Sequence, residues 1–401
     1  MRLVVNLLGG LLAVGWAGVA VDYALGARRG RTLETLPPFP EGQNAPPLSI
    51  VVAACNEEEK LAPAFRSLMA QEYPGPLQIV AVDDRSTDST PALLDSLAGE
   101  APVGVQVLVL HLPSLPPGWL GKNHALYQGA QRASGDWILF TDADVIFGSD
   151  ALSRAVNLTE REKLDHFVAF FGLDLRGFWE NIFGLAFSFL FFMRFRPWHV
   201  RNPRRKEYLG IGGFNLIRRT AYETIGTHRA IALEVADDME LGRRVKIAGL
   251  RSDVVGAKDL VRVRWQEGLS GLMNGLTKNA YAGLHYSPWI VFQSSVLLLF
   301  TMVLPFVGLF AARNRVTRAA YGFCTGVITL IGAYHARTGN VPPLYSLTLP
   351  FSTLLIIAVM FRSAWATERN GGITWRGTFY SLEELRTRAV PSVPTLIGGG
   401  P

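Results

Sequence analysis

Long apolar stretches lie towards both ends of the chain, and the middle alternates short apolar runs with polar segments. The first stretch, Leu3–Leu25, has the length of a membrane-spanning helix and few polar interruptions. Arg28, Arg29 and Arg31 follow it, and a basic cluster after a span places the next segment on the cytoplasmic side. A cleaved signal peptide, the alternative, would carry its charge before the apolar run. Residues 1–27 are therefore predicted to be a transmembrane anchor.

Three further apolar segments, at about 289–311, 319–336 and 344–361, follow the middle of the chain. We assign residues 276–362 to about three membrane segments and residues 363–401 to a C-terminal tail. If all three segments cross, the arginine-bearing tail ends on the outer side, against the tendency of basic residues to stay inside. One re-entrant segment would remove this conflict, and the sequence leaves open which one it is.

The middle of the chain has the pattern of an α/β domain. Residues 28–47 form a proline-rich linker, and residues 48–275 alternate strands with helices. Strands are predicted from apolar, β-branched or aromatic runs at Leu48–Ala54, Leu77–Val82, Val105–Leu110, Trp137–Phe140 and Phe170–Leu175, and those at Leu77–Val82 and Trp137–Phe140 are expected to be buried. Helices are predicted at Glu58–Gln71 and Pro91–Ala98. The expected fold is a Rossmann-like, mostly parallel, doubly wound sheet.

Two segments close to the apolar regions are predicted to lie along the membrane surface. Residues 177–200 are rich in Phe and Trp, but their uninterrupted apolar part, Ile182–Met193, is too short to span a bilayer. A buried core helix would explain the same composition equally well. Leu269–Leu284 has an amphipathic pattern and is the second such segment.

Composition narrows the choice of partners. The net charge is +6 and the pI is about 9.4, but the arginines are spread along membrane-flanking segments and are not gathered with aromatic residues in one stripe. This distribution favours anionic lipid headgroups over nucleic acid. Cys55 and Cys324 are the only cysteines, which argues against a disulfide framework and a zinc site.

Two carboxylates follow the predicted strand Trp137–Phe140. Asp142 and Asp144 are two residues apart, so in extended backbone both point to the same face and can reach one ion or phosphate. Ligands of open α/β sheets bind beyond the carboxyl ends of the strands. Hard oxygen ligands suit Mg2+ or Mn2+. A solvated turn is the alternative, because Asp is common where strands end.

Three other motifs contain candidate site residues. Lys122 lies near the start of a predicted helix, where a cation and free backbone amides favour a diphosphate; an exposed loop lysine is the alternative. Gly212 and Gly213 belong to a glycine-rich segment that an ordinary tight turn would explain. Asp237 and Asp238 stand at the start of a predicted helix, where capping alone would explain them.

Four motifs, in this order, resemble the family 2 glycosyltransferases with the GT-A fold. They are Ala54-Cys55-Asn56-Glu57, Val82-Asp83-Asp84, Gly121-Lys122-Asn123-His124-Ala125 and Thr141-Asp142-Ala143-Asp144. The resemblance implies a binding site for a nucleotide-sugar donor made by Asn56, Glu57, Asp83, Asp84, Lys122 and Asp142. It also implies that Asp142 and Asp144 hold Mn2+ or Mg2+ on the donor diphosphate.

The resemblance extends to the acceptor side of the expected site. The residues implied to face the acceptor are Gly212, Gly213, Asn215 and Trp265. Asp238 aligns with the family's catalytic base, and Asp237 stands where the family has a glutamate. Arg264 belongs to a partial match to the Gln-x-x-Arg-Trp signature, with Val261 in place of its first residue, and would neutralise the diphosphate.

The layout of the whole chain looks similar to the hopanoid-associated, carotenoid and ceramide glucosyltransferase-like branches of the family. This similarity implies an inverting, metal-dependent transfer of a sugar from a UDP-sugar to a membrane lipid. The expected setting is a bacterial-type inner membrane, crossed several times, with the catalytic domain on the cytoplasmic face. The alternatives are a processive polysaccharide synthase, against which Val261 counts, and a catalytically silent membrane scaffold.

Overall fold

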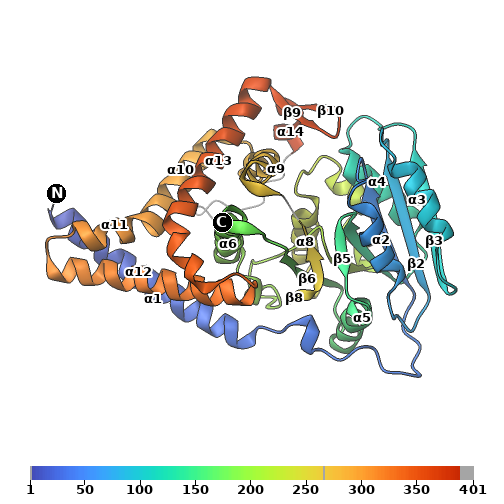
Figure 1. The fold of residues 1–401 in the computed structure, drawn as a ribbon, viewed down its shortest axis with the longest axis horizontal. Helices are drawn as coiled ribbons and strands as arrows, with labels where there is room; N and C mark the ends of the chain where they lie inside the picture. Colours follow the sequence, from blue (N-terminus) through green and yellow to red (C-terminus); the bar gives the residue numbers. More distant parts are fainter. Residues whose placement is uncertain (1, 265–266, 389–401) are drawn as a thin grey trace. The chain divides into compact units, whose positions relative to one another are not determined.

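The computed structural model describes residues 2–264 and 267–388, and the chain divides into two compact units (Figure 1). The helical unit consists of Met1–Gly30, Leu173–Trp198 and Arg264–Asn370. The sheet unit consists of Arg31–Gly172, His199–Val263 and Gly371–Pro401. The segment Leu173–Trp198, which the sequence analysis included in the α/β domain, therefore belongs with the helices. The segment after Asn370 belongs with the sheet.

An eight-stranded sheet lies at the centre of the sheet unit, in the order β3-β2-β1-β4-β7-β6-β8-β5. β1 pairs in parallel with β2 and β4, and β2 pairs in parallel with β3. β7 pairs antiparallel with β4 and β6, and β8 with β5. The expected mostly parallel sheet is confirmed, with antiparallel pairs beyond β4. The strands are β1 (Leu48–Ala54), β2 (Leu77–Asp84), β3 (Val105–Leu112), β4 (Trp137–Asp142), β5 (Val145–Phe147), β6 (His166–Leu173), β7 (Asn215–Arg218) and β8 (Ser252–Val263).

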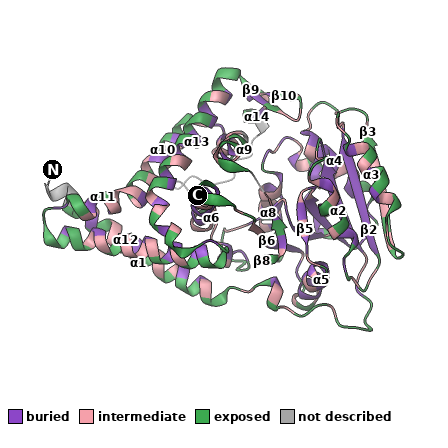
Figure 2. Cartoon of the chain, viewed as in Figure 1, coloured by how far each residue is buried: buried purple, intermediate pink, exposed green. Residues whose placement is uncertain are grey.

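The strands that lead to the candidate site are buried along their whole length. Every residue of β1 and β2 is buried (Figure 2), because continuous Val, Ile and Ala runs have no polar face to expose. Val51, Val82 and Ile138 pack with Ala125 and Leu241 in one hydrophobic core. The helices of this unit are α2 (Leu61–Met69), α3 (Thr90–Gly99), α4 (Gly121–Arg132), α5 (Ala151–Glu162), α7 (Arg219–Thr224), α8 (Asp237–Ile247) and α14 (Leu382–Arg388).

The proline-rich linker packs against the sheet unit. Arg31 pairs with Glu162 at the end of α5 at 2.6 Å and also with Asp253 of β8. Asn157 of α5 donates hydrogen bonds to the carbonyls of Pro37 and Pro38 at 3.0 and 2.9 Å. Proline has no backbone N–H, so a proline-rich segment does not pair as a strand and its carbonyls stay available to side-chain donors. The linker is thus part of the folded unit.

The helical unit is built from long apolar helices. Within it, α1 packs along α12, α12 packs on α11, and α13 packs on α6 and α9. Figure 1 shows α13 running steeply across the direction of α1 and α12. The helices of the helical unit are α1 (Arg2–Arg29), α6 (Gly177–Phe195), α9 (Gly268–Ala282), α10 (Pro288–Leu298), α11 (Leu304–Ala311), α12 (Arg315–Thr338) and α13 (Leu349–Asn370).

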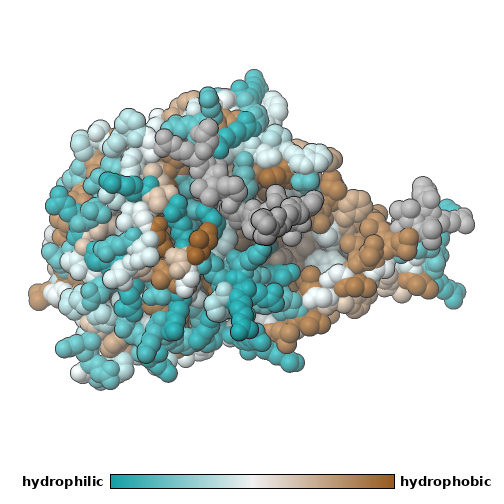
Figure 3. Space-filling model, turned by 180° about the vertical axis from the view of Figure 1, so that it is seen from behind, coloured by the Kyte–Doolittle hydropathy of each residue, from teal (hydrophilic) through white to brown (hydrophobic). Residues whose placement is uncertain are grey.

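The outer faces of these helices are apolar. Large hydrophobic side chains stand exposed on α1, α11 and α12, among them Leu11, Val14, Phe310, Val316 and Leu330. Figure 3 shows hydrophobic surface over these helices. Among the described residues, five helical stretches are long and apolar enough to cross a membrane. Exposed apolar patches of this extent are typical of surfaces in contact with lipid.

Candidate active site

The strand register gathers the predicted acidic residues at one edge of the sheet. Ala53 of β1 lies opposite Asp142 of β4, and Ala54 lies opposite Asp83 of β2. Asn56 and Glu57 therefore follow β1 at the level where β2 and β4 end. Parallel strands present their carboxyl ends together, so three separate turns supply polar side chains to one region.

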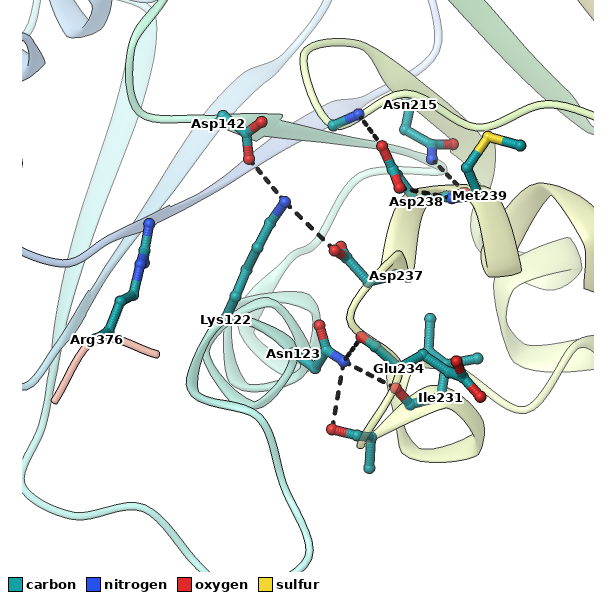
Figure 4. A network of polar contacts seen from close by, with 12 residues as sticks. Lys122, Asn123, Asp142, Asn215, Ile231, Glu234, Asp237, Asp238, Met239 and Arg376 are labelled. Carbon is teal, nitrogen blue, oxygen red and sulfur yellow. Dashed lines mark hydrogen bonds and ion pairs between the residues drawn. The ribbon is translucent and has the colours of Figure 1, made fainter. Parts of the chain in front are cut away.

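Lys122 connects two of these acidic segments. It lies in the first turn of α4, and its Nζ is 2.8 Å from Asp142 Oδ1 and 3.5 Å from Asp237 Oδ1 (Figure 4). The lysine side chain keeps only 14% of its accessible surface, whereas the Asp142 side chain keeps 41%. The ammonium group thus stands between carboxylates from β4 and α8, and Asp142 still has an open side.

Residues 210–213, called the glycine loop here, precede β7. This loop brings Asp238 to the region of Lys122 and Asp142. The N–H of Gly212 donates to Asp238 Oδ2 at 2.7 Å, and the carbonyl of Gly212 accepts from the N–H of Asp142 at 3.0 Å. A Cβ at Gly212 would lie 2.6 Å from Asp142 Oδ2, and one at Gly210 would lie 1.7 Å from the Asp238 carbonyl oxygen. A side chain at Gly210 would therefore meet the backbone of α8, and one at Gly212 would meet the Asp142 carboxylate.

Six of the predicted site residues line one small pocket, whereas Asn56, Glu57, Asp83, Asp84, Asp144, Gly213 and Arg264 are not part of its lining. Phe140 and Leu241 form apolar walls of it. His166 bonds Asn215 Oδ1 from behind at 2.6 Å, which fixes the amide that donates to the Asp238 carbonyl at 3.4 Å. The polar lining comes from Lys122, Asp142, Gly212, Asn215, Asp237 and Asp238. Side chains from β4, α4, α8 and β7 therefore share one cavity.

The pocket changes the acidity of its carboxylates. The surrounding protein atoms favour the neutral acid at Asp142, but Lys122 outweighs that effect and lowers the pKa of Asp142. Burial raises the pKa of Asp238, and the neighbouring Asp237 carboxylate raises it further, although Lys122 opposes both effects. For Lys122 burial acts in the opposite direction and lowers the pKa. The carboxylates of Asp142, Asp237 and Asp238 outweigh this effect, so the pKa of Lys122 is raised overall. Asp142 is held ionised, while Asp238 has the higher proton affinity that a base needs.

Asp144 and Glu57 form a second acidic group beside Asp142. Burial, followed by repulsion from Asp142 and Glu57, raises the pKa of Asp144 to about 7. Burial also raises the pKa of Glu57, partly offset by Arg376. Among the described residues, no three His, Cys, Asp or Glu side chains are grouped closely enough to hold an ion by themselves. The donor set nevertheless fits Mg2+ or Mn2+, because such ions take one or two carboxylates and complete their shell with phosphate oxygens.

The comparisons with known proteins place this site in a family. Residues 49–226 match the family described as Glycosyl transferase family 2. The chain carries a family 2 glycosyltransferase domain. The matched range holds β1 to β4, the glycine loop and β7, so the elements that carry Asn56, Glu57, Lys122, Asp142 and Gly212 all fall within it. The expected resemblance to this family is confirmed.

Two similar proteins extend this result. The glycosyltransferase is 24% identical to 4,4'-diaponeurosporenoate glycosyltransferase of Staphylococcus aureus, over 84% of this chain and 89% of the relative. It is similar to the solved mannosyltransferase PcManGT from Pyrobaculum calidifontis, in complex with GDP-Man and Mn2+, with a TM-score of 0.53 and 17% identity over 90% of this chain and 99% of that one. The expected GT-A fold and the assignment of the chain as a glycosyltransferase are confirmed.

The predicted nucleoside-side residues of this glycosyltransferase are held by local hydrogen bonds. Asn56 Oδ1 accepts from the N–H of Thr87 at 2.8 Å, and Asp83 Oδ1 accepts from the N–H of Ser86 at 3.1 Å. The Asp84 carboxylate is fully buried and pairs with Arg85 at 2.8 Å. These bonds fix the turns after β1 and β2, and binding of a nucleoside by these residues stays a prediction.

Of the two site residues predicted from the partial signature, the structure describes Arg264. Arg264 belongs to the helical unit, where it pairs with Glu180 at 2.7 Å and donates to the carbonyl of Asp174 at 2.7 Å. Glu180 also accepts from the N–H of Gly268, so this pair fastens α6 to the start of α9. Trp265 lies outside the described residues. Roles for Arg264 in donor binding and for Trp265 at the acceptor stay predictions.

Sequence analysis missed one side chain at this edge, Arg376. It lies in the C-terminal segment, and its Nη2 is 3.3 Å from Glu57 Oε1. The long separation in sequence hides this contact between the tail and the segment after β1.

Proposed function

We propose that this glycosyltransferase moves a sugar from a UDP-sugar to a membrane lipid by a single metal-dependent displacement that inverts the anomeric centre. The observation that carries the proposal is the shared pocket of Asp142, Lys122, Asp237 and Asp238 at the carboxyl edge of the sheet. One carboxylate of raised pKa beside a separate, ionised carboxylate supplies a base and an anchor for a cationic partner of the donor. The choice of UDP comes from the resemblance to glucosyltransferase-like branches.

Asp238 is the base in this scheme. Its Oδ2 bonds Gly212 and its Oδ1 bonds the N–H of Met239, so the carboxylate is oriented before any substrate arrives. It accepts the proton of the acceptor hydroxyl while that oxygen attacks the anomeric carbon and the nucleoside diphosphate leaves. General-base catalysis of this kind contributes roughly 10²–10⁴-fold. Asp237, paired with Lys122, adds negative charge beside Asp238 and keeps its proton affinity high.

The donor diphosphate is assigned to the region of Asp142 and Asp144. A bound Mn2+ or Mg2+ held there would neutralise negative charge on the departing diphosphate. PcManGT, solved with Mn2+ and GDP-Man, supports this assignment. Lys122 keeps Asp142 ionised and oriented until the donor and ion arrive.

A lipid acceptor is supported by two observations. The Staphylococcus aureus relative is named for diaponeurosporenoate, a carotenoid acid. The chain also has several apolar helices with exposed hydrophobic faces. An acceptor dissolved in the membrane reaches an enzyme that is held in the same membrane without leaving its apolar surroundings.

Chain connectivity supports a definite membrane topology. α6 leaves the sheet unit after β6 and returns to it at His199, and the chain returns again at Gly371 after α13. The part of the chain between β8 and β9 leaves the sheet unit and returns to it, so this part crosses the membrane an even number of times. In our proposal α1, the continuous α10–α11 stretch and α12 cross, whereas α6, α9 and α13 lie along the cytoplasmic surface. The steep direction of α13 relative to α12 supports this choice (Figure 1).

This topology removes most of the charge conflict found in the sequence. Arg337, at the end of α12, and Arg362 and Arg369 of α13 come to the cytoplasmic side, together with the tail. Arg315 and Arg318 at the start of α12 remain on the outer side. The majority of basic residues near helix ends then follow the positive-inside tendency.

A transfer assay tests the proposed function. Membranes containing the full-length protein are incubated with radiolabelled UDP-sugars and GDP-mannose, with Mn2+, and extracted with organic solvent. The proposal predicts label in the lipid phase from a UDP-sugar only when the protein and the ion are both present. Label in a water-soluble polymer would instead indicate a processive synthase. Absence of transfer and of nucleotide binding would indicate a silent scaffold.

A further inference from the structure

The segment after α13 forms a hairpin on the sheet unit. β9 (Gly372–Trp375) pairs antiparallel with β10 (Thr378–Ser381), with Trp375 opposite Thr378. The phenol of Tyr380 accepts a hydrogen bond from the N–H of Gly121 at 3.2 Å, and Thr378 Oγ1 accepts from Arg85 Nη1 at 3.2 Å. Gly121 begins α4 and Arg85 follows β2, so the hairpin lies at the edge where the donor-side residues gather.

The backbone conformation at the tip of the hairpin is unfavourable for arginine, the residue found there. Arg376 and Gly377 are the two central residues, with φ of 47° and 77°. Two-residue turns with both φ values positive favour Asn, Asp or Gly at the first position. A left-handed backbone is unfavourable for arginine because its Cβ approaches the following carbonyl oxygen. The geometry of the turn therefore does not explain why position 376 holds arginine. The reason lies in what the Arg376 side chain contacts.

The Arg376 guanidinium has unused hydrogen-bonding capacity inside the site. Its Nη2 donates to Glu57 at 3.3 Å, whereas its Nη1 is buried and has no hydrogen-bond partner among residues 2–264 and 267–388. Figure 4 shows the guanidinium extending beside the strand end that carries Asp142. A buried donor that has lost water without gaining an acceptor is unfavourable unless a ligand completes it.

The surroundings define the chemistry of that ligand. The guanidinium presents several donors in a planar fork that matches carboxylate and phosphate oxygens. The carboxylates of Glu57 and Asp142 already interact with this guanidinium, and the proposed donor brings two more charged groups as a diphosphate. A cation from the tail would both contact this diphosphate and offset its repulsion from the carboxylates.

We propose that Arg376 is a donor-binding residue whose guanidinium contacts the diphosphate of the nucleotide sugar, delivered by the hairpin that follows the last apolar helix. This inference rests on the proposed function. Arg376 touches the leaving group and not the acceptor, so its contribution falls on the phosphate part of the donor and leaves nucleoside contacts intact.

The test separates phosphate contacts from nucleoside contacts. The full-length protein in lipid nanodiscs is titrated calorimetrically, in Mn2+, with UDP and uridine and in parallel with GDP and guanosine. We expect Arg376→Ala to weaken binding of the diphosphate by about 10- to 100-fold and binding of the nucleoside by less than about twofold. Arg376→Lys keeps the positive charge but loses the planar arrangement of donors. Its affinity for the diphosphate is expected to lie between the affinities of Arg376→Ala and the wild type.

A matched variant controls for the hairpin as a structural element. Thr378→Val removes the bond to Arg85 and leaves Arg376 in place, so any loosening of the hairpin is expected to change diphosphate and nucleoside binding to the same degree. Diphosphate affinity unchanged in Arg376→Ala, or an equal loss for diphosphate and nucleoside, would overturn the inference while the proposed function stands. Failure of the wild type to bind either diphosphate would remove the proposed function, and this inference with it.

Discussion

Lys122 shows how one side chain sets the charge state of its neighbours. It stands 2.8 Å from Asp142 and 3.5 Å from Asp237, so it keeps one carboxylate ionised while it offsets the repulsion between others. Asp238 is not held in the same way: burial and then Asp237 raise its pKa, and Lys122 only moderates the shift. The pocket therefore holds a carboxylate of lowered pKa beside one of raised pKa, the pair that the proposed mechanism uses as anchor and base.

The pH dependence of transfer follows from this arrangement. Asp238 must be deprotonated to accept a proton, so the rate is expected to fall as the pH drops through its raised pKa. The ascending limb of the kcat profile should lie above the range of an ordinary aspartate, about 3.9. Lys122→Met removes a cation that lowers the pKa of Asp238, and it should move the limb of the residual activity to higher pH.

The measurement is kcat against pH for wild type and Lys122→Met under saturating donor. The exposed Lys163 at the end of α5 offers a matched control as Lys163→Met, which should leave the limb in place. If the ascending limb of the kcat profile of Lys122→Met lies at the same pH as in the wild type, or at lower pH, the electrostatic role given to Lys122 is contradicted.

At the scale of elements, the close approach of the glycine loop to α8 positions the base. Gly210 and Gly212 run beside Asp238 and Asp142, and Gly212 hydrogen-bonds to both segments. No side chain fits between them, because added atoms would meet backbone or a carboxylate. The spacing of the two aspartate-bearing elements is therefore set by the absence of side chains in the loop.

Substitution in this loop should cost stability as well as activity. A Cβ at Gly210 would lie 1.7 Å from the Asp238 carbonyl oxygen, so Gly210→Ala must push the start of α8 away. We expect a loss of roughly 1–3 kcal/mol, as for other overpacked sites, and a fall in transfer. Gly99→Ala, where nothing lies within 4 Å, is the control and should change stability by less than about 0.5 kcal/mol.

Thermal unfolding of the purified protein, followed beside the transfer rate, provides the measurement. An apparent melting temperature of Gly210→Ala equal to that of Gly99→Ala, with full activity, would show that the loop tolerates a side chain and would remove its positioning role.

Sequence patterns predicted some elements and missed others for physical reasons. β1, β2 and β3 were recognised because each contains a mainly apolar run, although β3 lies at the sheet edge and is only partly buried. β8 was missed because its twelve residues alternate in burial and include charged side chains. β5 and β7 were missed because they have three and four residues. α2 begins at Leu61, three residues after its predicted start, because residues 58–60 form a turn.

The candidate site was predicted as far as local sequence carries information. Asp142, Asp237 and Asp238 were singled out by their places at strand and helix ends, and the structure brings them into one pocket. The bridge through Lys122 and the approach of Arg376 to Glu57 were not predicted, because both depend on long-range packing. Arg264 pairs with Glu180, and its expected role at the diphosphate stays a prediction.

At the scale of the whole chain, the return of the tail to the sheet unit limits the number of crossings. Residues 371–388 are part of the sheet unit, so the proposed topology has an even number of crossings between β8 and β9. This constraint was invisible in hydropathy alone, which ranks α13 with the spanning helices. An apolar helix that lies along the membrane surface satisfies both observations.

The proposed topology is tested by single-cysteine labelling in intact cells. The native Cys55 and Cys324 are both buried, which keeps background labelling low. A membrane-impermeable maleimide should modify Arg313→Cys in intact cells, and should modify Asn340→Cys and Glu383→Cys only after permeabilisation. Labelling of Glu383→Cys from outside would place the tail on the other face and would contradict the assignment of α13.

The central claim is that a carboxylate of this pocket takes the acceptor proton during transfer from a nucleotide sugar. The most direct measurement is single-turnover transfer by Asp238→Asn beside donor binding by the same variant, with Glu223→Gln at an exposed position as control. We predict that Asp238→Asn binds the donor like wild type and transfers it at least about 10²-fold more slowly, while Glu223→Gln is unaffected. Transfer by Asp238→Asn at the wild-type rate would contradict the account.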